Sequence, residues 1–190
     1  MVEARKQNTA TFWPKLWGVR KGKPLPKCWQ QCPTLVRMKI FLAERIGSRR
    51  VVYLVDTDVV SEARKRDRAH PGVTAFFAEA ARRAAPLYLS AVTIGELRRG
   101  VEIVRYRGDH ALAELLDRWL RSLQREHADN ILAIDAETAE VWGRLRVPNP
   151  ENPLDKLIAA TALINGLTLV TGNVRHFANL GLTLVDPFAV

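Results

Sequence analysis

Short apolar runs alternate with longer segments of helical spacing over residues 51–190, and this alternation is the main pattern in the chain. Runs rich in leucine and β-branched residues predict buried strands at 51–55, 87–90, 131–135, 168–171 and 182–185. Apolar positions three and four residues apart predict helices near 58–65, 71–84, 92–106, 109–126, 136–146 and 153–165. Strands that alternate with helices and carry little polar alternation indicate an α/β fold with a mostly parallel sheet.

Residues 1–50 show no sustained period of either kind. They hold 12 Lys+Arg and 2 Asp+Glu, a net charge of +10, and only 36–46 predicts a short amphipathic helix. Residues 51–190 hold 17 basic and 18 acidic residues, a net charge of −1, so the overall +9 does not describe a basic domain. We therefore expect a basic, poorly ordered extension at 1–50 and one folded domain at 51–190.

Three interpretations of the extension stay open. Lysines and arginines interleaved with tryptophans suit an arm that grips and stacks on nucleic acid. A composition poor in acids also suits a targeting segment, although one serine in fifty residues is poor for a transit peptide. The favoured interpretation is a start assigned upstream of the true one, with the domain beginning at Met38 or near Val51 and Val52.

Several classes of protein are disfavoured by composition. Cys28 and Cys32 form a single C-x3-C pair, which builds neither a disulfide framework nor a closed zinc site from cysteine alone, and the four histidines are scattered. No apolar run approaches the roughly 18 residues of a transmembrane helix. We expect a soluble, cytoplasmic protein without classical zinc chemistry.

Carboxylates follow several of the predicted strands or open the next helix. Asp56 ends the first strand, Glu96 lies six residues past the second, and Asp155 opens the helix that leads into the fourth. Ligands of open parallel sheets bind beyond the carboxyl ends of the strands, so these acids are expected to share one crevice. Each also has a simpler interpretation as helix-start chemistry, because Asp58 suits a helix cap, Thr93-x-x-Glu96 a capping box, and Asn152-Pro153-x-Asp155 a helix N-terminus.

An acid cluster of this kind is stable only with a cation between the carboxylates, because their mutual repulsion otherwise raises the pKa values. Ligands that are all oxygen favour Mg2+ or Mn2+, and such a site suits phosphodiester hydrolysis by metal-activated water. The chain offers no G-x-S-x-G, no phosphate-binding G-x-x-x-x-G-K-[ST] and no convincing Cys/His pair.

Four motifs in order now resemble a known family. "YLVDTDVVSE", "LYLSAVTIGELRRGV", "PLDKLIAATALINGLTLVTGNVRHF" and "LTLVDPF" look like a PIN-domain ribonuclease, specifically the VapC-type toxin of a type II toxin–antitoxin pair. The resemblance covers about residues 51–190. It implies a PIN-like three-layer α/β/α sandwich, endoribonuclease activity that depends on Mg2+ or Mn2+, a homodimer, and inhibition by a small cognate antitoxin.

The resemblance also implies roles for particular residues. Asp56, Glu96 and Asp155 match the family's acids and are the expected catalytic metal ligands, while Thr171 matches a hydroxyl that lines the site and Thr57 neighbours the first acid. A further acid usual in the family is missing, because Asn173 and His176 stand at its two possible places. Asn173 and Asp58 are therefore weaker candidate metal ligands, His176 is a candidate phosphate donor or a surface residue, and Gly172 replaces a frequent arginine.

The remaining features carry less weight. The run Arg64, Lys65, Arg66 and Arg68 suits an RNA path or a solvated surface, and Arg98 and Arg99 suit phosphate contacts or ion pairs with acids. The leucine stripe at 112–123 with Trp119 is expected mainly in the core, with a dimer interface or antitoxin groove as the alternative. Besides a toxin, two functions stay open. One is an RNA- or protein-binding module with weakened catalysis, and the other is a PIN nuclease that acts in RNA processing or on DNA.

Overall fold

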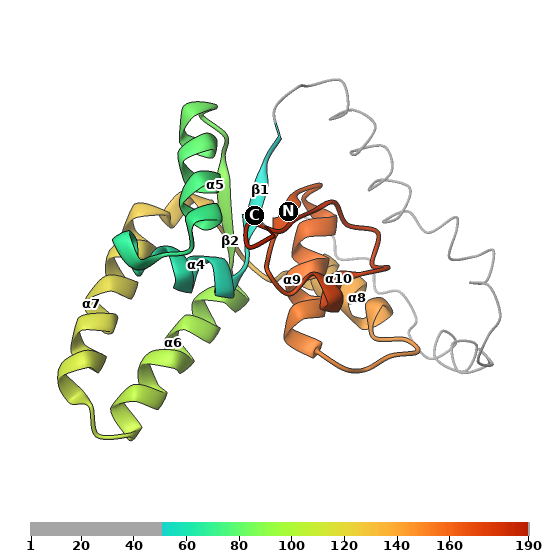
Figure 1. Ribbon diagram of the computed structural model, residues 1–190. Coiled ribbons are helices and arrows are strands. Elements are labelled where there is room, and N and C mark those ends of the chain that lie inside the picture. The colour runs from blue at the N-terminus through green and yellow to red at the C-terminus, as the bar shows by residue number, and fades with distance from the viewer. Residues whose placement is uncertain (1–50, 190) are drawn as a thin grey trace, which may run out of the picture. The chain divides into compact units, whose positions relative to one another are not determined.

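Five parallel strands form the sheet of this domain, in the order β3-β2-β1-β4-β5 (Figure 1). The structure is a computed structural model that describes residues 51–189. The predictions made for residues 1–50, including the 36–46 helix and the two cysteines, lie outside the described residues. The strands are β1 Tyr53–Val55, β2 Leu87–Ser90, β3 Ile131–Leu132, β4 Thr168–Val170 and β5 Leu184–Val185.

All five predicted strands are present, but four of them are shorter than predicted, and the third, predicted at 131–135, is shortened most. Asp135 instead caps the following helix, with its Oδ1 accepting from the Thr138 N–H at 2.8 Å and from the Thr138 hydroxyl at 2.7 Å. A side chain that satisfies a free helix N–H draws the chain out of the sheet. The contacts of Asp135 are those of a structural helix cap.

Helices fill the connections at nearly the predicted places. They are α4 Thr57–Ala63, α5 Pro71–Arg82, α6 Ala91–Tyr106, α7 His110–Glu126, α8 Ala136–Leu145, α9 Pro153–Ile164 and the short α10 Val174–Phe177, with 3-10 turns at Arg66–Arg68 and Ala128–Asn130. Side-chain oxygens of Ser90 and Asp109 cap α6 and α7, and Pro71 and Pro153 occupy the first turns of α5 and α9.

The sheet is covered on both faces, which confirms the predicted three-layer α/β/α sandwich (Figure 1). Successive residues of a strand point to opposite faces, and the central strand β1 shows this directly. Val55 packs in a core cluster with residues of α4, α5, α6 and α7, whereas Leu54 packs with Ile158 and Ala162 of α9 and Phe177 of α10. Both faces of β1 are therefore buried, and its carboxyl end is held firmly in place.

Helices α6 and α7 form an antiparallel pair whose outer surface differs from the prediction. Leu116 and Leu120 are buried as expected, but Leu112 and Leu115 of the same stripe are 41% and 52% exposed. The apolar stripe of α7 is wider than the surface that its neighbours cover, so its first turns remain open to solvent. Buried Asp117 pairs with Arg98 across the helices and with Arg121 on its own helix.

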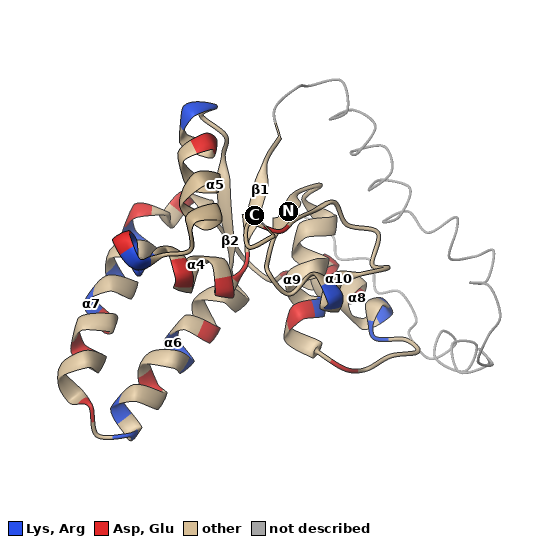
Figure 2. Ribbon diagram, in the orientation of Figure 1, with Lys and Arg blue, Asp and Glu red and all other residues tan. Residues whose placement is uncertain are grey.

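Charged residues of both signs are mixed along α6 and α7 (Figure 2). Acidic residues also occupy the first turns of α4 and α9, which lie near the end of β1. Within residues 51–189, no helix is both long and apolar enough to cross a membrane.

The strand order places a reversal of chain direction at the centre of the sheet. From β1 the chain moves outward to β2 and β3, and then returns to the other side of β1 to form β4 and β5. The helices that follow β1 and the helix that precedes β4 cover opposite faces, so their ends diverge beyond the strands. Such a switch point is where open α/β sheets bind their ligands.

Candidate functional site

Asp56 lies at this switch point, directly after β1. Its Oδ2 accepts a hydrogen bond from the Thr171 hydroxyl, which follows β4, at 2.8 Å, and its Oδ1 accepts from the Thr57 N–H at 2.7 Å. The residue is only 4% exposed, and its backbone N–H is bonded to the carbonyl of Val170. Asp56 also serves as the N-cap of α4, so the cap is Asp56 and not Asp58.

Glu96 approaches the same place from α6. The Thr57 hydroxyl donates to Glu96 Oε2 at 2.6 Å, so Thr57 links the first acid, its sequence neighbour, to the second. The alternative of a capping box does not hold, because Ser90 is the N-cap of α6 and the Thr93 hydroxyl is buried without a hydrogen-bond partner in the described part of the chain. The carboxylate of Glu96 is thus directed away from its own helix terminus.

Asp155 stands in the first turn of α9, and its Oδ2 lies 2.6 Å from Nδ1 of His176 in α10. Asn152 is the N-cap residue but makes no side-chain capping bond, and its backbone is left-handed with φ of 50°. From the sequence, His176 was predicted to be either a hydrogen-bond donor to phosphate or a surface residue. Its contact with Asp155 was not foreseen, because no sequence signal relates a residue of one helix to a residue 21 positions earlier on another.

Asp58 is tied to the turn after β4. Its Oδ2 accepts from the Gly172 N–H at 2.9 Å, and its Oδ1 accepts from the N–H of Val59 at 2.7 Å. Asn173, in the same turn, is exposed, and its side chain makes no capping bond to α10. Both weaker candidates therefore lie beside the switch point, Asp58 with its oxygens engaged and Asn173 with its amide toward solvent.

The electrostatics show that negative charge is concentrated here. Burial raises the pKa of Asp56 to about 6, and the charges of Asp58 and Asp155 add to the rise, whereas the bonds from Thr171 and Thr57 oppose it. Burial also raises the pKa of Asp58, against the bonds from the N–H groups of Gly172 and Val59. A divalent cation would favour the ionised form of Asp56 and relieve this repulsion.

The donors suit a hard cation, but they do not form a closed cage. Among residues 51–189, no three His, Cys, Asp or Glu side chains lie close enough together to hold a metal ion on their own. Mg2+ keeps several of its waters and takes only one or two protein carboxylates directly, so an open, acidic, oxygen-only site is compatible with it. Asp56, Glu96 and Asp155 would hold such an ion, with Asp58 and Asn173 as further oxygen donors.

A model of the PIN domain matches residues 53–181. The chain belongs to the PIN domain family. The predicted resemblance is confirmed, and the site described above is a site of a PIN domain.

Similar proteins extend this result. The "Plasmid stability protein StbB" of Pseudomonas syringae pv. tomato is 29% identical over 141 residues, which cover 71% of this chain and 97% of that protein. The crystal structure of FitAcB from Neisseria gonorrhoeae contains a chain that is 27% identical, with a TM-score of 0.64, over 73% of this chain and all of that one. A structure of VapBC2 from Rickettsia felis bound to a DNA fragment from their promoter shares the fold, at 20% identity and a TM-score of 0.55, over 71% of this chain and 98% of that one.

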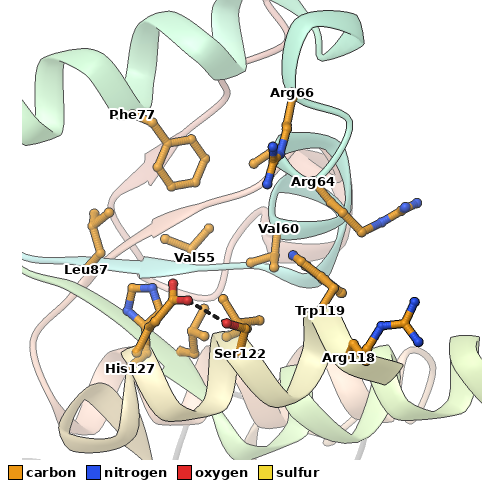
Figure 3. Close-up of a pocket in the computed structure, with 14 residues that line it drawn as sticks. Val55, Val60, Arg64, Arg66, Phe77, Leu87, Arg118, Trp119, Ser122 and His127 are labelled. Atoms are coloured by element: carbon orange, nitrogen blue, oxygen red, sulfur yellow. Dashed lines mark hydrogen bonds between the residues drawn. The ribbon is translucent and has the colours of Figure 1, made fainter. Parts of the chain in front are cut away.

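A separate pocket of about 520 Å3 lies on the α4, α5 and α7 face of the sheet (Figure 3). Trp119 and Ser122 of α7, and His127 just after it, face Phe77 of α5 and Val55 and Leu87 of the strands. Arg64, Arg66 and Arg118 stand around this apolar floor, and the guanidinium of Arg64 lies 5.7 Å from the centre of the Trp119 ring. Trp119 was expected mainly in the core, and it lines this pocket while it packs against the core.

Gly172 is required by the close approach of the C-terminal segment. A Cβ at this position would lie 2.6 Å from Cδ2 of Phe188 and 3.0 Å from Oδ2 of Asp58. We expect Gly172→Ala to lower the free energy of unfolding by about 1–2 kcal/mol, since overpacked atoms must displace the Phe188 ring. Urea unfolding measures this effect. Gly143→Ala is the matched control, because Gly143 lies within α8 with nothing near its Cβ position, and that change is expected to be neutral or stabilising.

Proposed function

We propose that this PIN domain is an endoribonuclease that depends on Mg2+ or Mn2+ and acts as the toxin of a toxin–antitoxin pair. The observation that carries the proposal is the buried Asp56 at the switch point of the sheet, whose neighbour Thr57 donates to Glu96 and whose pKa is raised in part by the charge of Asp155. In support, the similar proteins include a plasmid stability protein and a chain of the VapBC2 complex.

When bound, the cation would supply an activated water for in-line attack on a phosphodiester and would stabilise the leaving oxygen. The residues of the chain hold the ligands of the cation in place. Asp56 stays fixed because β1 is buried on both faces and Thr171 donates to its carboxylate. Thr57 holds Glu96 in the same way, and the exposed amide of Asn173 offers an oxygen or a donor to a metal-bound water or a phosphate.

Glu96→Gln tests this proposal, because it keeps the shape of the side chain and an acceptor for Thr57 but removes the charge. We expect RNA cleavage in Mg2+ to fall by more than the roughly 100-fold that loss of an orienting partner of a metal ligand costs. Cleavage of labelled single-stranded RNA and single-stranded DNA would be followed in parallel, with EDTA as the metal-free reference. Glu102→Gln, an ion-paired position farther along α6, is the matched control. Unchanged cleavage by Glu96→Gln would rule out the metal mechanism, and cleavage of DNA alone would assign the nuclease to another substrate.

The missing further acid supports a second candidate, an RNA- or protein-binding module with weakened catalysis. Asn173 and His176 add no carboxylate to the site, so a second cation would bind weakly. Wild-type protein that binds RNA but cleaves none in Mg2+ or Mn2+ would favour this module over the nuclease.

The proposed partner is a small cognate antitoxin, and the pocket on the α4, α5 and α7 face suits it. An apolar floor surrounded by Arg64, Arg66 and Arg118 fits a helical or extended segment with apolar anchors and acidic neighbours. The exposed Leu112 and Leu115 lie on the same helix as Trp119 at positions i, i+3 and i+7, so the apolar strip continues beyond the pocket. A homodimer is also part of the proposal, and sedimentation of the purified protein would establish it.

A further inference from the structure

The contact between His176 and Asp155 joins two separate helices at the open edge of the site. Nδ1 of His176 lies 2.6 Å from Oδ2 of Asp155, and the two side chains are 44% and 24% exposed. We assign the hydrogen of this contact to Nδ1, because a carboxylate oxygen accepts hydrogen bonds. The bond occupies Oδ2 and leaves Oδ1 of Asp155 available to another group.

The same arrangement recurs at all three acids. Asp56 accepts from the hydroxyl of Thr171, and Glu96 accepts from the hydroxyl of Thr57. In each case the donor belongs to a different element from the acid that it holds: the turn after β4 holds the end of β1, α4 holds α6, and α10 holds α9. Donors of this kind orient metal-ligating carboxylates, and their loss typically costs metal affinity.

An incidental surface ion pair explains the contact less well. Most ion pairs in the described part of the chain join residues three or four positions apart, within one helix or at its end, where proximity follows from local geometry. The exceptions besides His176–Asp155 join the long antiparallel helices α6 and α7. His176 and Asp155 lie 21 positions apart, and the contact exists only because α10 packs on α9, with Phe177 buried beside Ile158 and Ala159.

We propose that His176 is a positioning residue for Asp155, holding its carboxylate through Oδ2 so that Oδ1 would be free to bind a divalent cation. The inference rests on the proposed function, because it assigns Asp155 to the metal site. It gives His176 a role through its Nδ1 atom, which differs from direct contact between the ring and the RNA.

Three substitutions at His176 distinguish a role of Nδ1 from a role of Nε2. Asparagine places an amide nitrogen near the position of Nδ1, glutamine places one near the position of Nε2, and alanine removes both donors. We expect the dissociation constant for Mn2+, measured by isothermal titration calorimetry on the full chain, to rise about tenfold in His176→Ala and His176→Gln and to return to within about threefold of wild type in His176→Asn. RNA cleavage should follow the same order. His110→Ala, at an exposed histidine that begins α7, is the matched control.

A double variant tests the route of the effect. If His176 acts through Asp155, Asp155→Asn with His176→Ala should bind Mn2+ no more weakly than Asp155→Asn alone, because the second change removes nothing further. Wild-type affinity in His176→Ala, or rescue by glutamine instead of asparagine, would overturn the positioning role. A wild-type chain that binds no Mn2+ and cleaves no RNA would overturn the proposed function itself. Thermal unfolding of each variant confirms that the comparison is made between folded proteins.

Discussion

Asp56→Asn is expected to stabilise the metal-free protein while it abolishes metal-dependent cleavage. A buried carboxyl whose pKa is raised from 3.8 to about 6 lowers the free energy of unfolding at neutral pH, by roughly 3 kcal/mol if the whole shift is realised. Asparagine removes the buried charge and keeps an acceptor for the Thr57 N–H. We expect a gain of about 1–3 kcal/mol in urea unfolding at pH 7.5 in EDTA, together with loss of cleavage in Mg2+. A destabilised variant that still cleaves RNA would contradict the assignment of Asp56.

Asp58→Asn provides the matched control for this prediction. Both oxygens of Asp58 accept from backbone N–H groups, so an amide NH2 in place of one oxygen would face the Gly172 N–H and lose that bond. Burial also raises the pKa of Asp58, so the same change removes a buried charge there too, but the lost Gly172 bond offsets this, and the gain in stability should be clearly smaller than at position 56. Equal gains at positions 56 and 58 would point to a general effect of reduced negative charge at the switch point.

The pH dependence of stability follows from the same pKa. Below the unfolded value of 3.8 both states are protonated and Asp56 carries no penalty. Between 3.8 and about 6 the folded state binds the proton more tightly than the unfolded state, so this contribution to stability falls as pH rises and stays constant above that window. Groups with lowered pKa, such as Asp117 and Asp135, act in the opposite direction at lower pH. The difference between wild type and Asp56→Asn, measured in EDTA, isolates the step that belongs to Asp56.

The position of Asp56 at the end of β1 was predictable, whereas the hydrogen-bond partners of the acids were not. Asp56 follows a buried strand, and the rule for parallel sheets places such residues beyond the strand ends whatever the details of packing. The bond from Thr57 to Glu96 depends on how α4 rests on α6, and the bond from His176 to Asp155 depends on how α10 rests on α9. Periodicity describes which face of one helix is apolar, but it does not say which neighbour covers that face.

Leu112 and Leu115 illustrate the same limit for the core. They belong to the same helical stripe as Leu116 and Leu120, so the pattern predicted burial for all four, but only Leu116 and Leu120 pack in the core. The local capping interpretation of Glu96 failed for a related reason. Thr93-x-x-Glu96 has the sequence pattern of a capping box, but the N-cap of the helix is Ser90, three residues earlier. Glu96 therefore accepts its hydrogen bond from Thr57, a residue of another helix.

Trp119→Ala is expected to weaken binding of the antitoxin strongly while the nuclease site stays intact. A partly buried tryptophan that lines a pocket with an apolar floor is the typical anchor of an interface, where truncation costs 2 kcal/mol or more, or roughly a 30-fold loss of affinity. Arg118→Glu tests the charge around the groove without touching the core, because Arg118 is exposed, and a smaller loss of affinity is expected if the partner segment is acidic. Arg125→Glu, exposed on the same helix but outside the pocket lining, is its control. The measurements are the dissociation constant of the proposed cognate antitoxin and the growth of cells that express both proteins. Unchanged affinity in both groove variants would place the antitoxin elsewhere on the domain.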